Sequence, residues 1–244
     1  MEVNGRVALV TGGAVRVGRA LSLALAREGM RVVVHYHRSE EPAREVVRLI
    51  RKGGGEAVAV GGDLSRMAEL ERVAAEAEAA FGGVDVLVNN ASVFPAERLD
   101  EADEALWDDT LAVNLKAPFF LIQKLAPGMR SRGGAVIVNL ADLAGLQPWK
   151  SYAVHAISKA GLVHLTRVAA RALAPEIRVV AIAPGTVLPP EEMDEEAVES
   201  LAHRSPLRRI GSPEDVVEAL LYLLRADFVT GEVLTVDGGR MLNG

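Results

Sequence analysis

The 244-residue sequence contains no cysteine. This absence excludes a disulfide framework, a thiolate nucleophile and any metal site with cysteine ligands. The five histidines are scattered without the spacing of metal ligands, so we expect no bound metal.

The chain also lacks a long hydrophobic run and an excess of basic residues. No apolar stretch approaches the roughly 18 residues of a membrane-spanning helix, and residues 1–5 have no signal-peptide character. The net charge is −6, without a run rich in Lys and Arg. This balance argues against nucleic acid or an anionic membrane as the main partner. We therefore expect a soluble, cytoplasmic protein.

Short apolar runs alternate with helical segments along the whole chain. Continuous runs of Val, Ile and Leu indicate strands that are buried on both faces, as in a parallel sheet between helices. We predict an α/β protein with one doubly wound Rossmann-type domain over residues 1–244. Its parallel sheet should have about seven strands, with helices on both faces. The expected strands are residues 7–10, 31–36, 57–60, 85–88, 135–140, 177–182 and 232–236.

Two long helices are predicted at residues 106–125 and 151–173, and Ser39, Ser65 and Ser212 are expected to cap three others. Both long helices are apolar on more than one face, which suggests burial beyond one subunit. Residues 184–205 form an irregular segment after a strand. Its acidic residues are Glu191, Glu192, Asp194, Glu195 and Glu196. We interpret it as a substrate lid, with a solvated loop as the alternative.

Residues 11–18 form a glycine-rich turn between the first strand and the first helix. Gly12 and Gly18 allow a pyrophosphate to approach the backbone, and a helix starting near Val17 offers free N–H groups. The spacing is T-G-x-x-x-x-x-G rather than G-x-G-x-x-G. The turn predicts a dinucleotide site, and ordinary turn glycines are the alternative.

Residues 35–39, after the second strand, indicate which dinucleotide is bound. An NAD site carries an acid about 20 residues past the glycines, whereas a 2′-phosphate is met by a basic residue. This segment has Arg38 and no acid, and Arg16 in the turn can reach the same phosphate. We therefore expect NADPH. The alternative is that Arg16 and Arg38 are surface cations.

A set of polar residues is expected at the carboxyl ends of the strands, where ligands of parallel sheets bind. Tyr152, His155 and Lys159 are spaced i, i+3, i+7 and share one face of a predicted helix. Asp142 follows the fifth strand, and Asn114 lies on the preceding long helix. The alternative for this stripe is a solvated polar face.

Together these motifs resemble the short-chain dehydrogenase/reductase family over essentially the whole chain. The residues that carry the resemblance follow the family's order: Thr11-Gly12 to Gly18, Asp63, Asn89-Asn90-Ala91, Asn114, Lys159, Pro184-Gly185 and Asp237-Gly238-Gly239. Within the family the chain is most similar to pteridine reductases. The parallels are Arg16, residues 35–39, Ser92, Phe94, and Asp142 where most relatives carry a catalytic Ser. One residue departs, because His155 stands at the Tyr of Tyr-x-x-x-Lys.

The resemblance implies that Lys159 holds the nicotinamide ribose and lowers the pKa of the proton donor, and that Asn114 supports a proton relay. It also implies that Phe94 stacks a pterin, with Arg16 and Ser92 bonding the pterin edge. An apolar wall for another carbonyl substrate is the alternative for Phe94. The predicted cofactor-binding residues are Gly12, Arg16, Val17, Gly18, His35, Tyr36, His37, Arg38, Ser39, Asp63 at the adenine, Leu64, Asn90, Ala91, Lys159, Pro184, Gly185 and Thr186. The predicted catalytic residues are Asp142, His155, Lys159, Asn114 and Tyr152, and the substrate residues are Arg16, Ser92, Phe94 and Asp142.

The identity of the proton donor depends on His155. The ammonium of Lys159 disfavours a charged imidazole nearby, which makes a lone His155 a poor acid. Either Asp142 pairs with His155 and restores its acidity, or Tyr152 donates the proton. We hypothesise that an Asp142–His155 pair supports slow reductase activity.

The predicted function is NADPH-dependent hydride transfer to a pterin or dihydropterin. Reduction of a ketone on an acyl carrier is one alternative, although acyl carriers are acidic and the acidic lid opposes that encounter. A catalytically silent NADPH-binding protein is the other. Relatives commonly pair the two long helices, so we also expect a homotetramer.

Overall fold

The computed structural model describes residues 1–189 and 193–243. Seven strands form one sheet in the order β3-β2-β1-β4-β5-β6-β7, and every neighbouring pair is parallel. This confirms the predicted parallel sheet of a Rossmann-type fold. The strands are β1 (Val7–Val10), β2 (Arg31–Tyr36), β3 (Ala57–Gly61), β4 (Val86–Asn89), β5 (Ala135–Leu140), β6 (Ile177–Pro184) and β7 (Val233–Val236).

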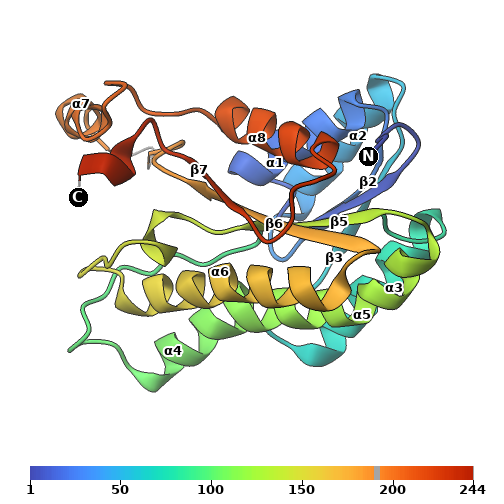
Figure 1. Cartoon of the computed structure of the whole chain (residues 1–244), viewed down its shortest axis with the longest axis horizontal. Helices are drawn as coiled ribbons and strands as arrows, with labels where there is room; N and C mark the ends of the chain where they lie inside the picture. Colours follow the sequence, from blue (N-terminus) through green and yellow to red (C-terminus); the bar gives the residue numbers. More distant parts are fainter. Residues whose placement is uncertain (190–192, 244) are drawn as a thin grey trace.

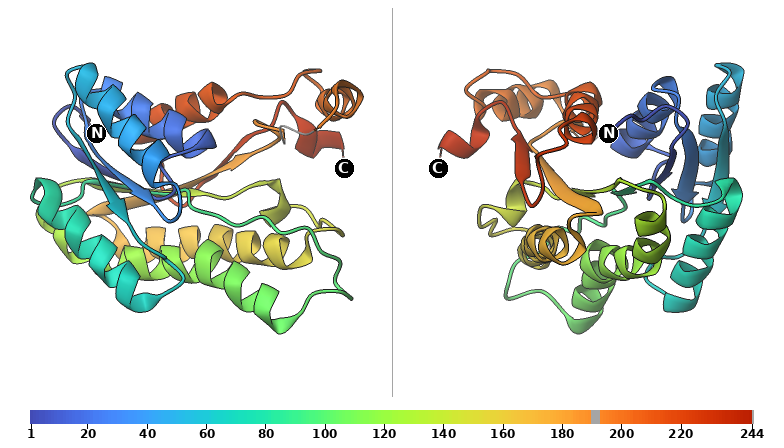
Figure 2. Two further views of the ribbon diagram at one scale, coloured as in Figure 1. Left: turned by 180° about the vertical axis from the view of Figure 1, so that it is seen from behind. Right: turned by 45° about the vertical axis from the view of Figure 1, so that its right-hand side comes forward.

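Helices cover both faces of the sheet (Figures 1 and 2). One face carries α1 (Arg16–Arg27), α2 (Glu40–Lys52) and α8 (Pro213–Arg225). The other carries α3 (Met67–Phe81), α4 (Glu104–Leu111), α5 (Ala117–Ser131) and α6 (Ala153–Leu173). Beyond the carboxyl edge lie α7 (Glu195–His203) and the short helix η3 (Arg240–Asn243), and η2 (Leu143–Gly145) follows β5.

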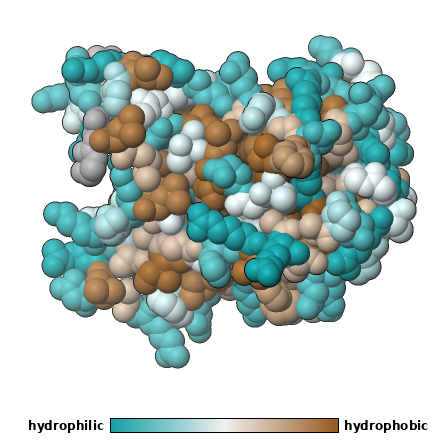
Figure 3. All heavy atoms as spheres, viewed as in Figure 1, coloured by the Kyte–Doolittle hydropathy of each residue, from teal (hydrophilic) through white to brown (hydrophobic). Residues whose placement is uncertain are grey.

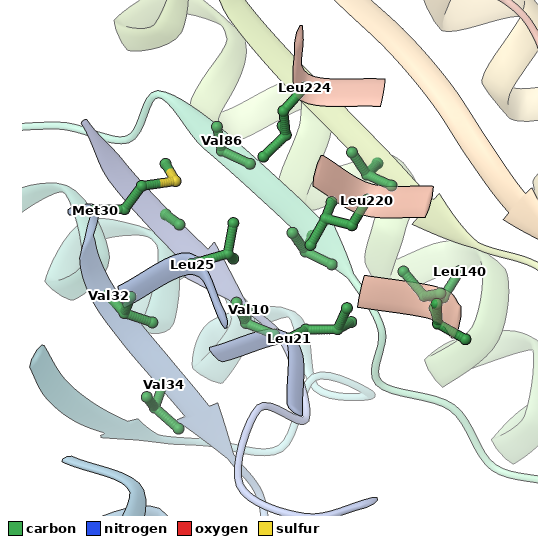
Figure 4. Packing of buried hydrophobic residues seen from close by; sticks show 14 of the residues in the cluster. Val10, Leu21, Leu25, Met30, Val32, Val34, Val86, Leu140, Leu220 and Leu224 are labelled. Carbon is green, nitrogen blue, oxygen red and sulfur yellow. The ribbon is translucent and has the colours of Figure 1, made fainter. Parts of the chain in front are cut away.

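The side chains of the central strands pack into two hydrophobic cores, one on each face of the sheet, which explains the continuous apolar sequence of these strands. In β1, Ala8 and Val10 pack with Leu21 and Leu25 of α1, as Figure 4 shows for Val10. The alternate residues of β1 enter the opposite core under α3 and α5. Because burial of each large side chain contributes about 1.5–3 kcal/mol, both faces resist a shift of the strand. The carboxyl ends of the strands are thereby fixed along one edge.

The strand order reverses between β1 and β4, and this reversal positions the site. The chain runs outward through β2 and β3, then returns to place β4 on the other side of β1. Thr11 Oγ1 accepts hydrogen bonds from the N–H groups of Asn90 at 2.9 Å and Ala91 at 3.0 Å. The glycine turn and the segment after β4 therefore meet at the point where ligands of such sheets bind.

Three helices differ from the sequence-based prediction. The expected helix 106–125 is divided by a π-helical turn, η1 (Ala112–Lys116). Ser65 does not cap α3, because its hydroxyl donates to Asp63 Oδ1 at 2.7 Å and the helix begins two residues later. Tyr152 precedes α6 and has a non-helical backbone. The capping box of Ser212 and Asp215 at α8 is confirmed.

The predicted lid, residues 184–205, contains a helix that the sequence analysis missed. Asp194 caps α7, where its carboxylate accepts from the Ala197 N–H at 2.8 Å. Glu191 and Glu192, expected to belong to the acidic lid, lie outside the described residues. No helix in the described part of the chain is long and apolar enough to cross a membrane.

Candidate active site

The glycine turn is closely packed against the segment after β4. Gly12 has a φ of 59°, which favours glycine, and a Cβ added there would lie 3.1 Å from Ala91 Cα. A Cβ at Gly18 would overlap the carbonyl oxygen of Gly12. Both positions therefore require glycine, because the turn packs directly against neighbouring backbone and side-chain atoms.

His35 supports this turn from below. Its Nδ1 accepts from the Gly12 N–H at 3.2 Å, and its Nε2 donates to Gly62 O at 3.0 Å. Burial lowers the pKa of His35 to about 4, so the ring is neutral and matches one donor with one acceptor. His35 was predicted to bind cofactor, and the structure gives it a further task of holding the turn.

A cavity of about 570 Å³ extends from the turn along the ends of β2 and β3. Most predicted cofactor residues line it: Gly12, Arg16, Val17, Gly18, His35, His37, Arg38, Ser39, Asp63, Leu64, Asn90 and Ala91. Tyr36 is outside this lining, because its ring packs against Gly61 on the neighbouring strand. Asp109 and Val113 also line the cavity, and no sequence motif marks them.

Asp63 lines this cavity as a carboxylate. Burial raises the pKa of Asp63, but hydrogen bonds from Ser65 and the charges of His37 and Arg66 hold it below its usual value. Its Oδ2 lies 3.9 Å from His37 Nε2. The carboxylate of Asp63 can accept hydrogen bonds from a nucleotide, and the basic residues beside it can bind phosphate.

His155 and Asp142 form a short hydrogen-bonded pair, as predicted. Nε2 of His155 lies 2.6 Å from Asp142 Oδ2, and Nδ1 lies 3.1 Å from Val93 O. Asn114 Nδ2, 3.4 Å from Nδ1, directs its hydrogens to Val93 O and to Ser158 Oγ. The ring therefore lies between two hydrogen-bond acceptors, Asp142 Oδ2 and Val93 O.

Lys159 lies behind this pair. Nζ donates to Leu140 O at 2.7 Å, and burial lowers the pKa of Lys159 to about 8 although the charge of Asp142 opposes this. Burial alone would raise the pKa of Asp142, but the hydrogen bond from His155 and the charge of Lys159 hold it below its usual value. Asp142 is thus a carboxylate between His155 and the ammonium of Lys159, and its side chain keeps 20% exposure.

Three rings form an aromatic wall, which we define as Phe94, Tyr152 and Trp149. Phe94 is 53% exposed and stacks on Tyr152 at 4.5 Å between centroids, with His155 against it at 4.4 Å. Trp149 contacts Tyr152 edge-on at 5.9 Å. Tyr152 lies before α6 and not on the helix face that carries Lys159. Its ring therefore stacks on Phe94.

The aromatic wall borders a second cavity of about 600 Å³. Asp142, Pro184, Gly185 and Thr186 line this cavity, whereas His155 and Lys159 do not. The two cavities share Arg16 and Val17, so they form one cleft. Figure 3 shows the carboxyl edge of the sheet indented below α7.

Two predicted substrate residues have partners within the protein. Arg16 has a φ of 51° and donates from Nη2 to Leu188 O at 2.8 Å. Its side chain therefore extends to the segment after β6. Ser92 Oγ donates to Asn114 Oδ1 at 3.1 Å and lines the first cavity. Sequence analysis missed Trp149, Arg204 and Arg240, which line the second cavity. The only signal was the proximity of Arg240 to the Asp237-Gly238-Gly239 motif.

Comparison with known proteins shows similarity over nearly the whole chain. Residues 13–240 match a family model described as enoyl-(acyl carrier protein) reductase. The sequence is 36% identical over 238 residues to 3-oxoacyl-[acyl-carrier-protein] reductase FabG from Staphylococcus epidermidis, covering 95% of this chain and 97% of that protein. It is 35% identical over 250 residues to an uncharacterized oxidoreductase from Thermotoga maritima, covering 98% of each.

A similar solved structure is FolM alternative dihydrofolate reductase 1 from Brucella canis, complexed with NADP. The two structures superpose with a TM-score of 0.93 at 33% identity, covering 99% of this chain and 96% of that one. The sequence and structural similarities therefore extend through both cavities of the cleft.

Proposed function

Because the chain belongs to the short-chain dehydrogenase/reductase family and is one of its oxidoreductases, we propose that it reduces a pterin or dihydropterin with NADPH. The observation that carries the proposal is Asp142, a carboxylate that is hydrogen-bonded to the imidazole of His155 and lines the same cavity as the exposed ring of Phe94. A flat heteroaromatic substrate needs a stacking surface and a few fixed polar groups.

The first cavity has the features that NADPH requires. The glycine turn and the start of α1, where Val17 and Gly18 line the cavity, would hold a pyrophosphate, and Arg38 supplies a cation for a 2′-phosphate. Pro184, Gly185 and Thr186 continue the lining into the second cavity, where the nicotinamide end would lie. The bound dinucleotide supplies the hydride. FolM, whose structure holds NADP, offers a precedent for this use of the fold.

The remaining proton comes from the Asp142–His155 pair. His155 is 1% exposed and has no place in the cavity lining, so its proton reaches a substrate through Asp142. In this mechanism the proton on Nε2 passes to Asp142 Oδ2, and Asp142 delivers it to the reduced ring. Lys159 keeps the carboxylate charged between turnovers, and Asn114 holds the segment before Phe94 through Val93.

Reduction of a 3-oxoacyl thioester is the second candidate, favoured by the similarity to FabG. The two activities are separated by assaying NADPH oxidation with 7,8-dihydrobiopterin, dihydrofolate and a 3-oxoacyl thioester. We expect turnover of the dihydropterins only. Turnover of the thioester alone would replace the proposed substrate, and failure of every substrate would favour a silent NADPH-binding protein.

A matched variant separates chemistry from cofactor binding. Asp142→Asn keeps the size of the side chain but removes its capacity to accept and deliver a proton. We expect at least a 100-fold loss of turnover, as general acid catalysis contributes about 10²–10⁴-fold. NADPH affinity, measured by fluorescence titration, should stay within about twofold, since Asp142 lies outside the lining of the first cavity.

A further inference from the structure

The aromatic wall is built from two segments that are far apart in the sequence. Phe94 belongs to the segment between β4 and α4, whereas Tyr152 immediately precedes α6 and His155 lies in the first turn of that helix. The two segments run side by side, with a parallel bridge between Glu97 and Tyr152 (Figure 1). The contacts at this junction therefore determine where the stacking ring lies relative to the Asp142–His155 pair.

Glu97 makes two hydrogen bonds across the junction. Its backbone N–H donates to Ser151 O at 3.1 Å, and its Oε1 accepts from the Val154 N–H at 2.8 Å. Val154 is the second residue of α6, and the N–H groups of a first helical turn have no acceptor within the helix. Residues 153–156 are Ala, Val, His and Ala, so Glu97 supplies a negative charge that the first turn of α6 does not itself contain. The side chain of Glu97 thus caps α6 from another segment.

The segment that carries Phe94 is held at a second point by Val93. The Val93 N–H donates to Asn114 Oδ1 at 2.9 Å, and Val93 O accepts from Asn114 Nδ2 at 3.0 Å. Phe94 lies between Val93 and Glu97 and stacks on Tyr152 at 4.5 Å between ring centroids. Because the side chain of Phe94 is half-exposed, the contacts of its flanking residues decide where its ring lies.

We propose that Glu97 is a positioning residue, which holds Phe94 against Tyr152 and thereby sets the place of the substrate ring relative to Asp142. Glu97 lies outside the lining of both cavities, so it acts through Phe94 and the start of α6. The inference rests on the proposed function for the identity of the ring. It adds that affinity for this ring depends on a carboxylate that touches neither substrate nor cofactor.

Two substitutions of Glu97 test the role of its hydrogen bond to α6. Glu97→Ala removes the acceptor for the Val154 N–H, and KM for 7,8-dihydrobiopterin should rise about tenfold, since hydrogen bonds to charged groups are strong. The kcat should stay within about threefold, because a lost stacking surface weakens the ground state and the transition state alike. Glu97→Gln keeps an acceptor oxygen and should keep KM within about twofold of the parent. An unchanged KM in Glu97→Ala would overturn the proposal.

Asp103→Ala is the matched control, because Asp103 caps α4 at the other end of the same segment. Its carboxylate accepts from the Leu106 N–H at 2.8 Å, which is the interaction that Glu97 provides for α6. Both alanine variants lose a helix cap and should unfold at a lower urea concentration than the parent. Only Glu97→Ala should raise KM. An equal rise in both variants would indicate a general effect of lost stability and contradict the proposal.

A double-mutant cycle shows whether Glu97 acts through Phe94. In a Phe94→Ala background the stacking ring is already absent, so adding Glu97→Ala should raise KM by less than about twofold more. Such a non-additive result supports the proposal. Full additivity of the two effects would mean that Glu97 acts independently of Phe94, and it would overturn the proposal.

Hydrogen exchange separates this inference from the proposed function, because the measurement needs no substrate. Amide exchange is compared for peptides that cover residues 92–97 and 152–155. Faster exchange of both peptides in Glu97→Ala, but not in Asp103→Ala, supports the positioning role even if no pterin is reduced. Unchanged exchange in Glu97→Ala overturns the positioning role whatever the substrate is, and normal pterin turnover beside it leaves the proposed function intact.

Discussion

His155 and Asp142 are separated by 13 residues, yet Nε2 and Oδ2 lie 2.6 Å apart. The imidazole is buried while the carboxylate reaches the cavity, so the proposed mechanism uses the two side chains as one proton donor.

Substitution of His155 tests this pair. Turnover is compared at about pH 7, where Lys159, with a pKa of about 8, is still mostly charged. His155→Ala should lose turnover about 100-fold, and His155→Tyr should retain turnover with a fall at higher pH. If His155→Ala matches the parent and Tyr152→Phe is inactive, Tyr152 is the donor.

Arg38→Asp should weaken NADPH binding far more than NADH binding. The change replaces the cation that we propose for the 2′-phosphate with an anion, and we expect at least a tenfold difference between the cofactors, or about 1.4 kcal/mol. Affinities for both are measured by fluorescence titration. Arg48→Asp is the control, since Arg48 is exposed on α2 and paired with Glu45 outside the first cavity. Equal losses for the two cofactors would contradict the assignment.

His35 should make the fold sensitive to mild acid. Its pKa is about 4 in the folded protein and about 6.5 when unfolded, so the unfolded chain binds the additional proton first. The stabilisation is complete above about pH 6.5 and is lost as pH falls toward 4; we expect about 2 kcal/mol less stability at pH 5 than at pH 7. Urea denaturation of the parent and His35→Asn measures this. The same pH dependence in both proteins would exclude His35 as its source.

The protein should assemble as a closed symmetric tetramer, with D₂ symmetry expected. Phe119 on α5 is 46% exposed, and Ile157 and Val168 on α6 are 46% and 51% exposed. Burial of these side chains between paired helices would stabilise an interface. Light scattering at micromolar concentration should give four times the mass of one chain. Val168→Glu should lower that mass, whereas a monomeric parent would refute the prediction.

The strands were predictable because their residues are apolar on both faces. The Asp142–His155 pair was predictable because Asp142 follows β5 and is in sequence range of the face of α6 that carries His155. Other features depend on contacts that the local sequence does not encode. Ser65 resembles a helix cap, but Asp63 competes for its hydroxyl. Tyr36 and Arg38 both lie near the end of β2, but Arg38 lines the first cavity and Tyr36 does not. The ring of Tyr36 packs instead against Gly61 on the neighbouring strand. Arg240 enters the cavity from the end of the chain, which no spacing rule predicts.

Phe94 is already immobilised on one side by Tyr152 and His155, while much of its ring stays exposed. Immobilising a freely rotating side chain on ligand binding costs about 0.5–1.5 kcal/mol of conformational entropy. For Phe94, most of this cost has already been met when the protein folds. A flat ring that enters the cleft therefore meets a preorganised surface, and more of its stacking energy is expressed as affinity.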